Sequence, residues 1–146
     1  MKASDVMSVD VVAAKDSVTA IEIATRIVLG AFNGVPIIDD NGIVIGIVTT
    51  IDMLRVIRDG KNLENMHARD LMTKSPSVVK QDTEIENIID IMDKKGIDLI
   101  PIAREETDGR LVGVVSRLDI LAEKMNERFV TIERKSISNS SRVTTS

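Results

Sequence analysis

The sequence contains an internal repeat, and this feature limits the possible folds more than any other. The run Gly46–Leu54 aligns without gaps to Gly113–Leu121, 67 residues further on (113 − 46), and four of the nine pairs are identical. Upstream landmarks recur in the same order at an offset of 65: Ala3–Met7 with Ala68–Met72, and Val35–Ile37 with Ile100–Ile102. Self-similarity of this kind indicates a duplicated unit, here of about sixty residues.

Both copies show the same succession of apolar periods. In the second copy Ile85, Ile88 and Met92 recur along one helix face, and Gly96 can end that helix. In the first copy two β-branched runs flank Asp39–Gly42, which is typical of a tight hairpin. The predicted strands are 11–13, 35–39 and 43–48, then 77–79, 100–103 and 111–115, and the helices after the hairpins are 50–59 and 117–128.

The predicted fold class is therefore α/β (α+β), with two tandem β-α-β-β-α units related by pseudo-two-fold symmetry. The predicted boundaries are 1–60 for the first unit, 61–67 for a polar linker and 68–127 for the second unit. Residues 128–146 form a Ser/Thr-rich C-terminal tail, which we expect to be mobile.

Composition excludes or disfavours several functions. The absence of Cys excludes disulfides, thiolate metal sites and Cys nucleophiles. A net charge of −4 and only two aromatic residues disfavour a nucleic-acid partner. No apolar run reaches the roughly 20 residues of a membrane-spanning helix, and no signal-peptide pattern opens the chain. We expect a cytoplasmic protein without a membrane partner.

The sequence does not indicate an enzyme. It contains no recognisable nucleophile–base pair, no metal-ligand cluster and no Gly-rich phosphate loop. We expect a binding or interaction protein that requires neither a cofactor nor a metal.

Each repeat carries a Ser/Thr-x-x-Asp motif where a strand is predicted to turn into a helix: Thr49 with Asp52, and Ser116 with Asp119. The spacing has two interpretations. It is that of a capping box, in which hydroxyl and carboxylate satisfy backbone N–H groups. It also suits a ribose-phosphate, because the amides of a helix start attract phosphate and a carboxylate accepts hydrogen bonds from a ribose diol.

A duplicated unit of this kind, ending each time in Gly, two apolar residues and Ser/Thr-x-x-Asp, resembles a pair of cystathionine-β-synthase (CBS) domains, the Bateman module. The resemblance covers residues 1 to about 127. It implies that Thr49, Asp52, Ser116 and Asp119 contact the ribose and phosphate of an adenosine-containing ligand.

The resemblance also implies residues that enclose the base. Where the second strand of each unit begins, these are Gly34, Val35 and Pro36, then Leu99, Ile100 and Pro101. Leading into the first strand of each unit, they are Ser8, Val9 and Val11, then Thr73, Ser77 and Val78. For both prolines the alternative is a strand start or a sheet edge, where no N–H is needed.

The two motifs differ at one position, where the first copy has Thr50 and the second has Arg117. A basic side chain there can contact phosphate. If only one site accepts an anionic nucleotide, we expect the site that Arg117 faces. Arg55, three residues past Asp52, is a further basic candidate, and a solvated surface position is the alternative for both.

The favoured function is a regulatory module that senses AMP, ADP, ATP or an S-adenosylmethionine-like compound in the cleft between the two units. The expected partners are this small molecule, a second copy in a homodimer, and an unidentified regulated protein. The alternative is a dimerisation or interaction scaffold whose nucleotide sites are vestigial, so that both motifs are only helix caps.

Overall fold

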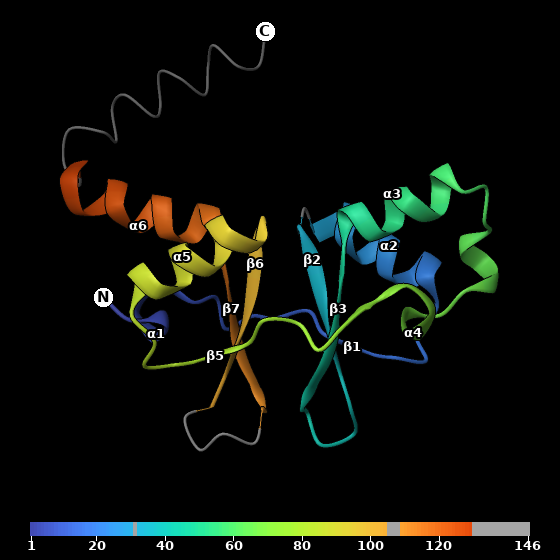
Figure 1. Ribbon diagram of the computed structural model, residues 1–146, viewed down its shortest axis with the longest axis horizontal. Coiled ribbons are helices and arrows are strands. Elements are labelled where there is room, and N and C mark those ends of the chain that lie inside the picture. The colour runs from blue at the N-terminus through green and yellow to red at the C-terminus, as the bar shows by residue number, and fades with distance from the viewer. Residues whose placement is uncertain (31, 105–108, 130–146) are drawn as a thin grey trace, which may run out of the picture.

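The computed structural model describes residues 1–30, 32–104 and 109–129, so the predicted tail lies outside the described residues from position 130 onward (Figure 1). The first elements are α1 (Ala3–Val6), β1 (Ala14–Lys15), α2 (Ala20–Gly30), β2 (Gly34–Ile38), β3 (Val44–Thr49) and α3 (Thr50–Arg58). After the 3-10 helix η1 (Leu63–Asn65) come α4 (Ala68–Leu71), β4 (Thr73–Lys74), β5 (Val79–Lys80), α5 (Ile85–Lys95), β6 (Leu99–Ala103), β7 (Leu111–Ser116) and α6 (Arg117–Phe129). No helix among these is long and apolar enough to cross a membrane.

The strands form two sheets with the same plan. In the first, β1 runs parallel to β2, and β2, β3 and β4 are antiparallel neighbours. In the second, β5 is parallel to β6 and β6 antiparallel to β7. At the outer edge of β7, Ser8 pairs with Val114 through N–H···O bonds of 2.9 and 3.0 Å, and so takes the place that β4 takes beside β3.

Each sheet has its own apolar core, and each core contains a short helix from the other repeat. Ala3 of α1 is fully buried in the cluster built on Ile85 and Ile100 of the second unit. Ala68 of α4 is fully buried in the cluster built on Ile23 and Val35 of the first unit. Neither core is complete without the other repeat.

Backbone hydrogen bonds fix this exchange symmetrically. The Ala3 amide donates to the Thr83 carbonyl at 2.8 Å, and the Ala68 amide donates to the Val18 carbonyl at 2.8 Å. Each short helix therefore lies against the start of the long helix of the opposite unit.

Close packing explains the glycine in each repeated strand. A Cβ built on Gly113 would lie 2.8 Å from the Met7 sulfur and 2.9 Å from the Ser8 carbonyl oxygen. A Cβ on Gly46 would lie 2.5 Å from the Met72 sulfur. Only glycine lets these strands approach the segments that cross over from the other repeat.

The two hairpin tips are also joined. Ile43 and Arg110 form an isolated antiparallel bridge, the Leu111 amide donates to the Gly42 carbonyl at 3.0 Å, and the Val44 amide donates to the Gly109 carbonyl at 3.1 Å. In Figure 1 both hairpins point downward, away from α3 and α6. The units thus meet at the hairpin tips as well as through their exchanged helices.

The predicted mixed fold with two repeated units is confirmed, and the hairpin strands and following helices lie within one residue of their predicted limits. Gly96, at φ 64°, ends α5 as expected. The strand predicted at 11–13 is wrong, because pairing with β2 begins only at Ala14. Residues 8–13 instead lead from β7 of the second sheet to β1 of the first, and we call such a connection between the sheets a crossing segment. The sequence interpretation missed α1, α4 and β4, which are four residues long or shorter.

Candidate functional site

The first strand-to-helix junction joins β3 to α3 and holds Asp52 at the third position of the helix. Asp52 is buried, with 6% of its surface exposed. One carboxylate oxygen accepts hydrogen bonds from the Thr49 amide at 2.8 Å and the Thr49 hydroxyl at 3.0 Å. The other lies 3.4 Å from Nη1 of Arg55. Since a buried charge is costly unless it is paired and hydrogen-bonded, these contacts explain how the carboxylate is tolerated there.

The second junction, between β7 and α6, forms a reciprocal capping box. The Ser116 amide donates to the Asp119 carboxylate at 2.8 Å, and the Asp119 amide donates to the Ser116 hydroxyl at 3.1 Å. Asp119 is half-buried, unlike Asp52. Both motifs therefore cap their helices, as the first interpretation of the spacing expects.

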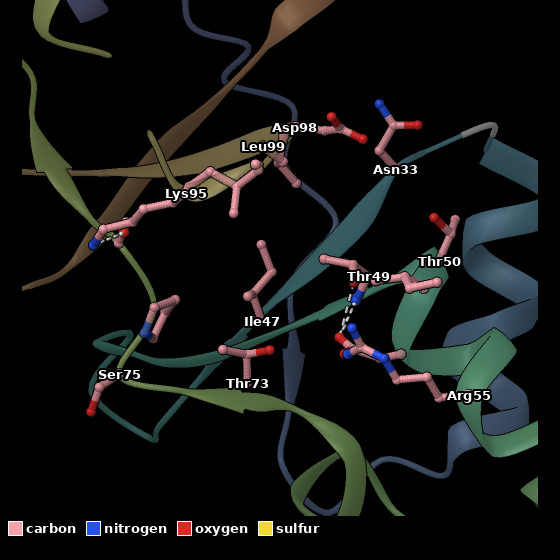
Figure 2. A pocket seen from close by; sticks show the side chains of 16 residues that line it. Asn33, Ile47, Thr49, Thr50, Arg55, Thr73, Ser75, Lys95, Asp98 and Leu99 are labelled. Carbon is pink, nitrogen blue, oxygen red and sulfur yellow. Dashed lines mark hydrogen bonds and ion pairs between the residues drawn. The ribbon is translucent and has the colours of Figure 1, made fainter. Parts of the chain in front are cut away.

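A cavity of about 460 Å³ opens beside the first junction, and we call it the Thr49 cavity (Figure 2). Its other walls are the crossing segment 73–77 and the turn 95–99 between α5 and β6. In the view of Figure 2, Lys95 and Arg55 lie on opposite sides of the cavity, with Ile47 and Thr73 between them.

A smaller cavity of about 240 Å³ lies beside the second junction, and we call it the Ser116 cavity. The crossing residues Ser8, Val11 and Val12 form one wall, and Phe32 to Gly34 form another. Each cavity thus combines the motif of one repeat with the crossing segment of the other. Leu99 and Asn33 line both cavities.

The structure brings eleven of the seventeen predicted residues to these cavities. Thr49, Asp52, Thr73, Ser77 and Leu99 line the Thr49 cavity. Ser8, Val11, Gly34, Pro36, Ser116 and Asp119 line the Ser116 cavity. Six others line neither: Val9, Val35, Val78, Ile100, Pro101 and Arg117.

Strand alternation accounts for two of these six. Successive side chains of a strand point to opposite faces, so Gly34 and Pro36 reach the cavity while Val35 between them enters the apolar core. Ile100 occupies the equivalent core position in the second unit. Pro101 is fully buried, Val78 is half-buried and Val9 is exposed.

Arg117, the predicted phosphate contact of the second site, lines neither cavity. Its Nε donates to the Ile97 carbonyl at 3.2 Å and lies 3.1 Å from the Asp98 carboxylate. The side chain lines a groove between α5 and α6 instead. As the first residue of α6, it folds back over the turn before β6 and is held there.

Sequence reasoning missed Lys95 as a cavity residue. Two adjacent lysines before Gly96 fit the end of a helix, where cations complement the helix dipole. In the structure the Lys95 ammonium donates to the Ser77 hydroxyl at 2.9 Å, so it bridges α5 and the crossing segment. The repeat itself carried a usable signal for Asn33 and Asp98, which are equivalent at an offset of 65 (98 − 33) and both line the Thr49 cavity.

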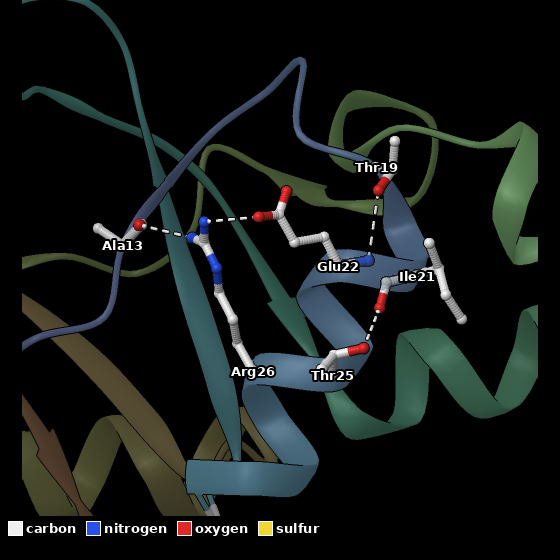
Figure 3. A network of polar contacts seen from close by, with 6 residues as sticks. All are labelled: Ala13, Thr19, Ile21, Glu22, Thr25 and Arg26. Carbon is white, nitrogen blue, oxygen red and sulfur yellow. Dashed lines mark hydrogen bonds and ion pairs between the residues drawn. The ribbon is translucent and has the colours of Figure 1, made fainter.

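The crossing segment of the Ser116 cavity is tethered differently (Figure 3). Arg26 of α2 donates to the Ala13 carbonyl at 3.2 Å, and its other terminal nitrogen lies 3.2 Å from Glu22. The repeat equivalent of Arg26 is Ile91 (26 + 65), which cannot make these contacts. A basic side chain thus fixes the approach to each cavity, but from different helix positions.

The charges outside the cavities have local roles. The Lys15 ammonium donates to the Asp40 carboxylate at 2.7 Å. This hydrogen bond and the positive charge of Lys15 lower the pKa of Asp40.

Within the ranges that the structure describes, no group of three or more His, Cys, Asp or Glu side chains lies close enough together to hold a metal ion.

The fold and the two cavities define a class of protein: a tandem pair of α+β units with ligand-sized spaces between them. A family model for the CBS domain matches residues 3–59 and again 68–126. The chain therefore belongs to the CBS domain family.

Relatives agree with this assignment. Protein MK0525 of Methanopyrus kandleri is 34% identical over 113 residues, which are 77% of this chain and 57% of MK0525. Inosine-5'-monophosphate dehydrogenase of Methanocaldococcus jannaschii is 28% identical over 123 residues, which are 84% of this chain and 23% of that enzyme. The chain thus spans only part of the length of these relatives.

Solved structures share the fold. The CBS domain pair of protein MJ0100, in complex with 5'-methylthioadenosine and S-adenosyl-L-methionine, superposes with a TM-score of 0.78 at 22% identity, over 88% of this chain and 98% of that one. CBSX2 in complex with AMP has a TM-score of 0.75 at 23% identity, over 87% and 98% of the two chains.

Proposed function

We propose that this protein is a regulatory module that binds an adenosine-containing ligand, such as AMP, ADP, ATP or S-adenosylmethionine, in the cavities between its two units. The observation that carries the proposal is the repeated site. Twice, a helix start with a hydroxyl and a carboxylate borders a cavity whose opposite wall comes from the other repeat. Solved CBS pairs with AMP, or with 5'-methylthioadenosine and S-adenosylmethionine, support this ligand class.

The local chemistry suits a ribose-phosphate. Amides at a helix start favour an anion, and a carboxylate beside them accepts hydrogen bonds from a vicinal diol. The apolar parts of the walls, such as Ile47 and Leu99 in the Thr49 cavity, suit a base. The 460 Å³ of this cavity falls in the usual range for small-molecule sites, about 300–1,000 Å³.

The site residues act by binding rather than by catalysis in this proposal. A ligand held between the units changes how they pack, and this change is passed to a partner. The regulated partner chain and the cytoplasmic location stay predictions of the sequence, as does the absence of a required cofactor.

Ultraviolet absorption and thermal melting test the proposal. Without Trp, Tyr or Cys the chain is nearly transparent at 280 nm, so a copurified adenine compound would dominate the spectrum at 260 nm. A ligand that binds the native state stabilises it and so raises the melting temperature. At a free ligand concentration one hundred times the dissociation constant, the stabilisation is about 2.7 kcal/mol. We expect this response from at least one of AMP, ADP, ATP, S-adenosylmethionine and NAD.

Matched variants identify the residues. The double variant Asp52→Ala with Asp119→Ala is expected to lose the rise in melting temperature on addition of ligand. The control is Asp90→Ala, which removes an exposed carboxylate of α5 that lines neither cavity and should keep this rise. If the double variant melts lower but its ligand response is unchanged, both carboxylates are only caps and the proposed site is wrong.

A second candidate function, a dimerisation scaffold with vestigial sites, rests on a different surface. The four long helices expose large apolar side chains in both units: Val28, Leu29, Ile51, Leu54, Ile57, Ile89, Leu118, Leu121 and Met125. Since the pseudo-symmetry gives both units a similar apolar face, a second copy offers a matching surface. We propose a homodimer through these helices, compatible with either function.

Light scattering at increasing concentration tests the dimer. We expect twice the monomer mass for the unchanged chain and the monomer mass for the variant with both Leu54→Glu and Leu121→Glu. An unchanged mass in this variant, with its melting temperature retained, excludes the helix face as the interface. Dimerisation without any adenosine response would favour the scaffold.

A further inference from the structure

The two cavities differ in the charged side chains that line them. The Thr49 cavity is lined by two basic side chains, Arg55 and Lys95. Of the described residues that line the Ser116 cavity, none is Lys, Arg or His, and Asp119 is the charged one. The Thr49 cavity therefore offers an anionic ligand two cationic side chains, and the Ser116 cavity offers none.

Arg55 has donors to spare for a ligand. One terminal nitrogen lies 3.4 Å from Asp52, and the side chain is 57% exposed. A guanidinium carries five N–H donors in a rigid fork that matches phosphate oxygens. Its contact with Asp52 orients the group at the helix start and leaves most of its donors for the cavity.

Lys95 approaches from the opposite side. Its ammonium donates to the Ser77 hydroxyl at 2.9 Å, which holds the charge at the cavity wall. An ammonium has three donors, so this bond leaves two.

The two carboxylates of the Thr49 cavity are already compensated. Asp52 accepts two hydrogen bonds from Thr49 and pairs with Arg55. Asp98 lies 3.1 Å from Arg117, whose charge is held outside the cavity. Asp52 and Asp98 therefore repel a phosphate in this cavity less strongly than two unpaired carboxylates would.

The Ser116 cavity suits a ligand without phosphate. It has about half the volume of the other, and Phe32, Leu118 and Val11 contribute apolar side chains to its walls. A phosphate in the Ser116 cavity would meet the amides at the start of α6 but no cationic side chain. Its desolvation is therefore compensated less well there than in the Thr49 cavity.

We propose that the two cavities sort ligands by charge, so that the Thr49 cavity binds the phosphate-bearing compound through Arg55 and Lys95, and the Ser116 cavity binds an uncharged or cationic compound. The inference rests on the proposed function for the adenosine part of each ligand. The sequence position of Arg117 favours the second site, beside Ser116, for the anion. The proposal assigns the anion to the Thr49 cavity instead.

Backbone amide NMR spectra can follow the two cavities separately. AMP and adenosine are titrated into the full chain, with the amides of Thr50 and Asp52 reporting on the Thr49 cavity and those of Leu118 and Asp119 on the Ser116 cavity. We expect AMP to shift the first pair at concentrations at least about tenfold lower than the second, since hydrogen bonds to charged groups are each worth tenfold or more. Adenosine should lack this preference.

Charge-neutral variants connect the preference to the two cations. The double variant Arg55→Gln with Lys95→Gln should lose the AMP preference, because both side chains stay polar but lose their charge. The control, Arg58→Gln with Lys94→Gln, removes the same charge from neighbouring exposed positions that line neither cavity, and should keep it. Equal AMP affinity at both cavities, or a preference that survives the first double variant, overturns the proposal.

Ribose 5-phosphate separates this proposal from the proposed function. If adenosine shifts neither pair of amides but ribose 5-phosphate shifts those of Thr50 and Asp52 selectively, charge sorting holds and the adenosine ligand is wrong. If AMP and ribose 5-phosphate both shift the two pairs alike or shift neither, charge sorting is wrong, whatever adenosine does.

Discussion

The two strand-to-helix junctions arose from one repeated motif but bury their carboxylates differently. Asp52 is buried and pairs with Arg55, whereas Asp119 is half-buried in a capping box with Ser116. The same four-residue motif therefore caps a helix in both units, and in the first unit it also forms a buried ion pair. What surrounds the motif, above all the residue one turn further along the helix, decides its chemistry.

The comparison extends to the cores, and here we expect the largest effect. Ile37 and Ile102 occupy equivalent, fully buried positions in the two sheets. Each Ile→Ala variant should lose about 2–5 kcal/mol of unfolding free energy in urea. Because each core contains a helix of the other repeat, both variants should still unfold in one transition. Two separate transitions would contradict the interdependence of the units.

The next largest effect should be the loss of stability when the motif carboxylate of each junction is removed, and this loss should differ between the two junctions. Asp52→Ala deletes a buried group that has three polar contacts and should cost about 1.5–3 kcal/mol, in the range for hydrogen bonds to charged groups. Asp119→Ala removes a cap and should cost about 1 kcal/mol. Urea unfolding measures both, and equal losses would contradict the difference in burial.

The strand glycines give a smaller contrast. Gly113→Ala pushes a Cβ against the Ser8 carbonyl, which is backbone, and should cost about 1–3 kcal/mol as overpacking does. Gly46→Ala mainly meets the flexible Met72 side chain and should fall at the low end of this range. The melting temperatures of the two variants, measured side by side, check the order.

The smallest effect concerns the exposed Lys15–Asp40 pair of the first unit. Because the folded state lowers the pKa of Asp40, the pair stabilises the protein above the unfolded pKa of about 3.9 and loses this contribution as the pH falls through the folded value. Asp40→Asn should flatten the dependence of stability on pH only in this acidic window. An effect at neutral pH alone would contradict the assignment.

The sequence predicted the repeated parts well because duplication displays each signal twice. Both junctions, both hairpins and the cap spacing at Thr49 and Ser116 follow from local pattern. The exchange of α1 and α4 could not be predicted, since periodicity shows that a helix has an apolar face but not which copy covers it. The orientation of the Arg117 side chain could not be predicted for a related reason. A basic residue beside a motif can turn toward the cavity or, as here, toward the carbonyl of Ile97.

The bonded hairpin tips have a mechanical consequence. If a ligand separates the units at the cavities while Ile43 and Arg110 stay joined at one end of the molecule, the separation is a tilt about that contact. A tilt displaces points in proportion to their distance from the pivot, so α3 and α6, at the end away from the tips, travel furthest (Figure 1). Under the proposed function, a small displacement between the units at the cavities would thus become a larger displacement of α3 and α6, the helices of the proposed dimer surface.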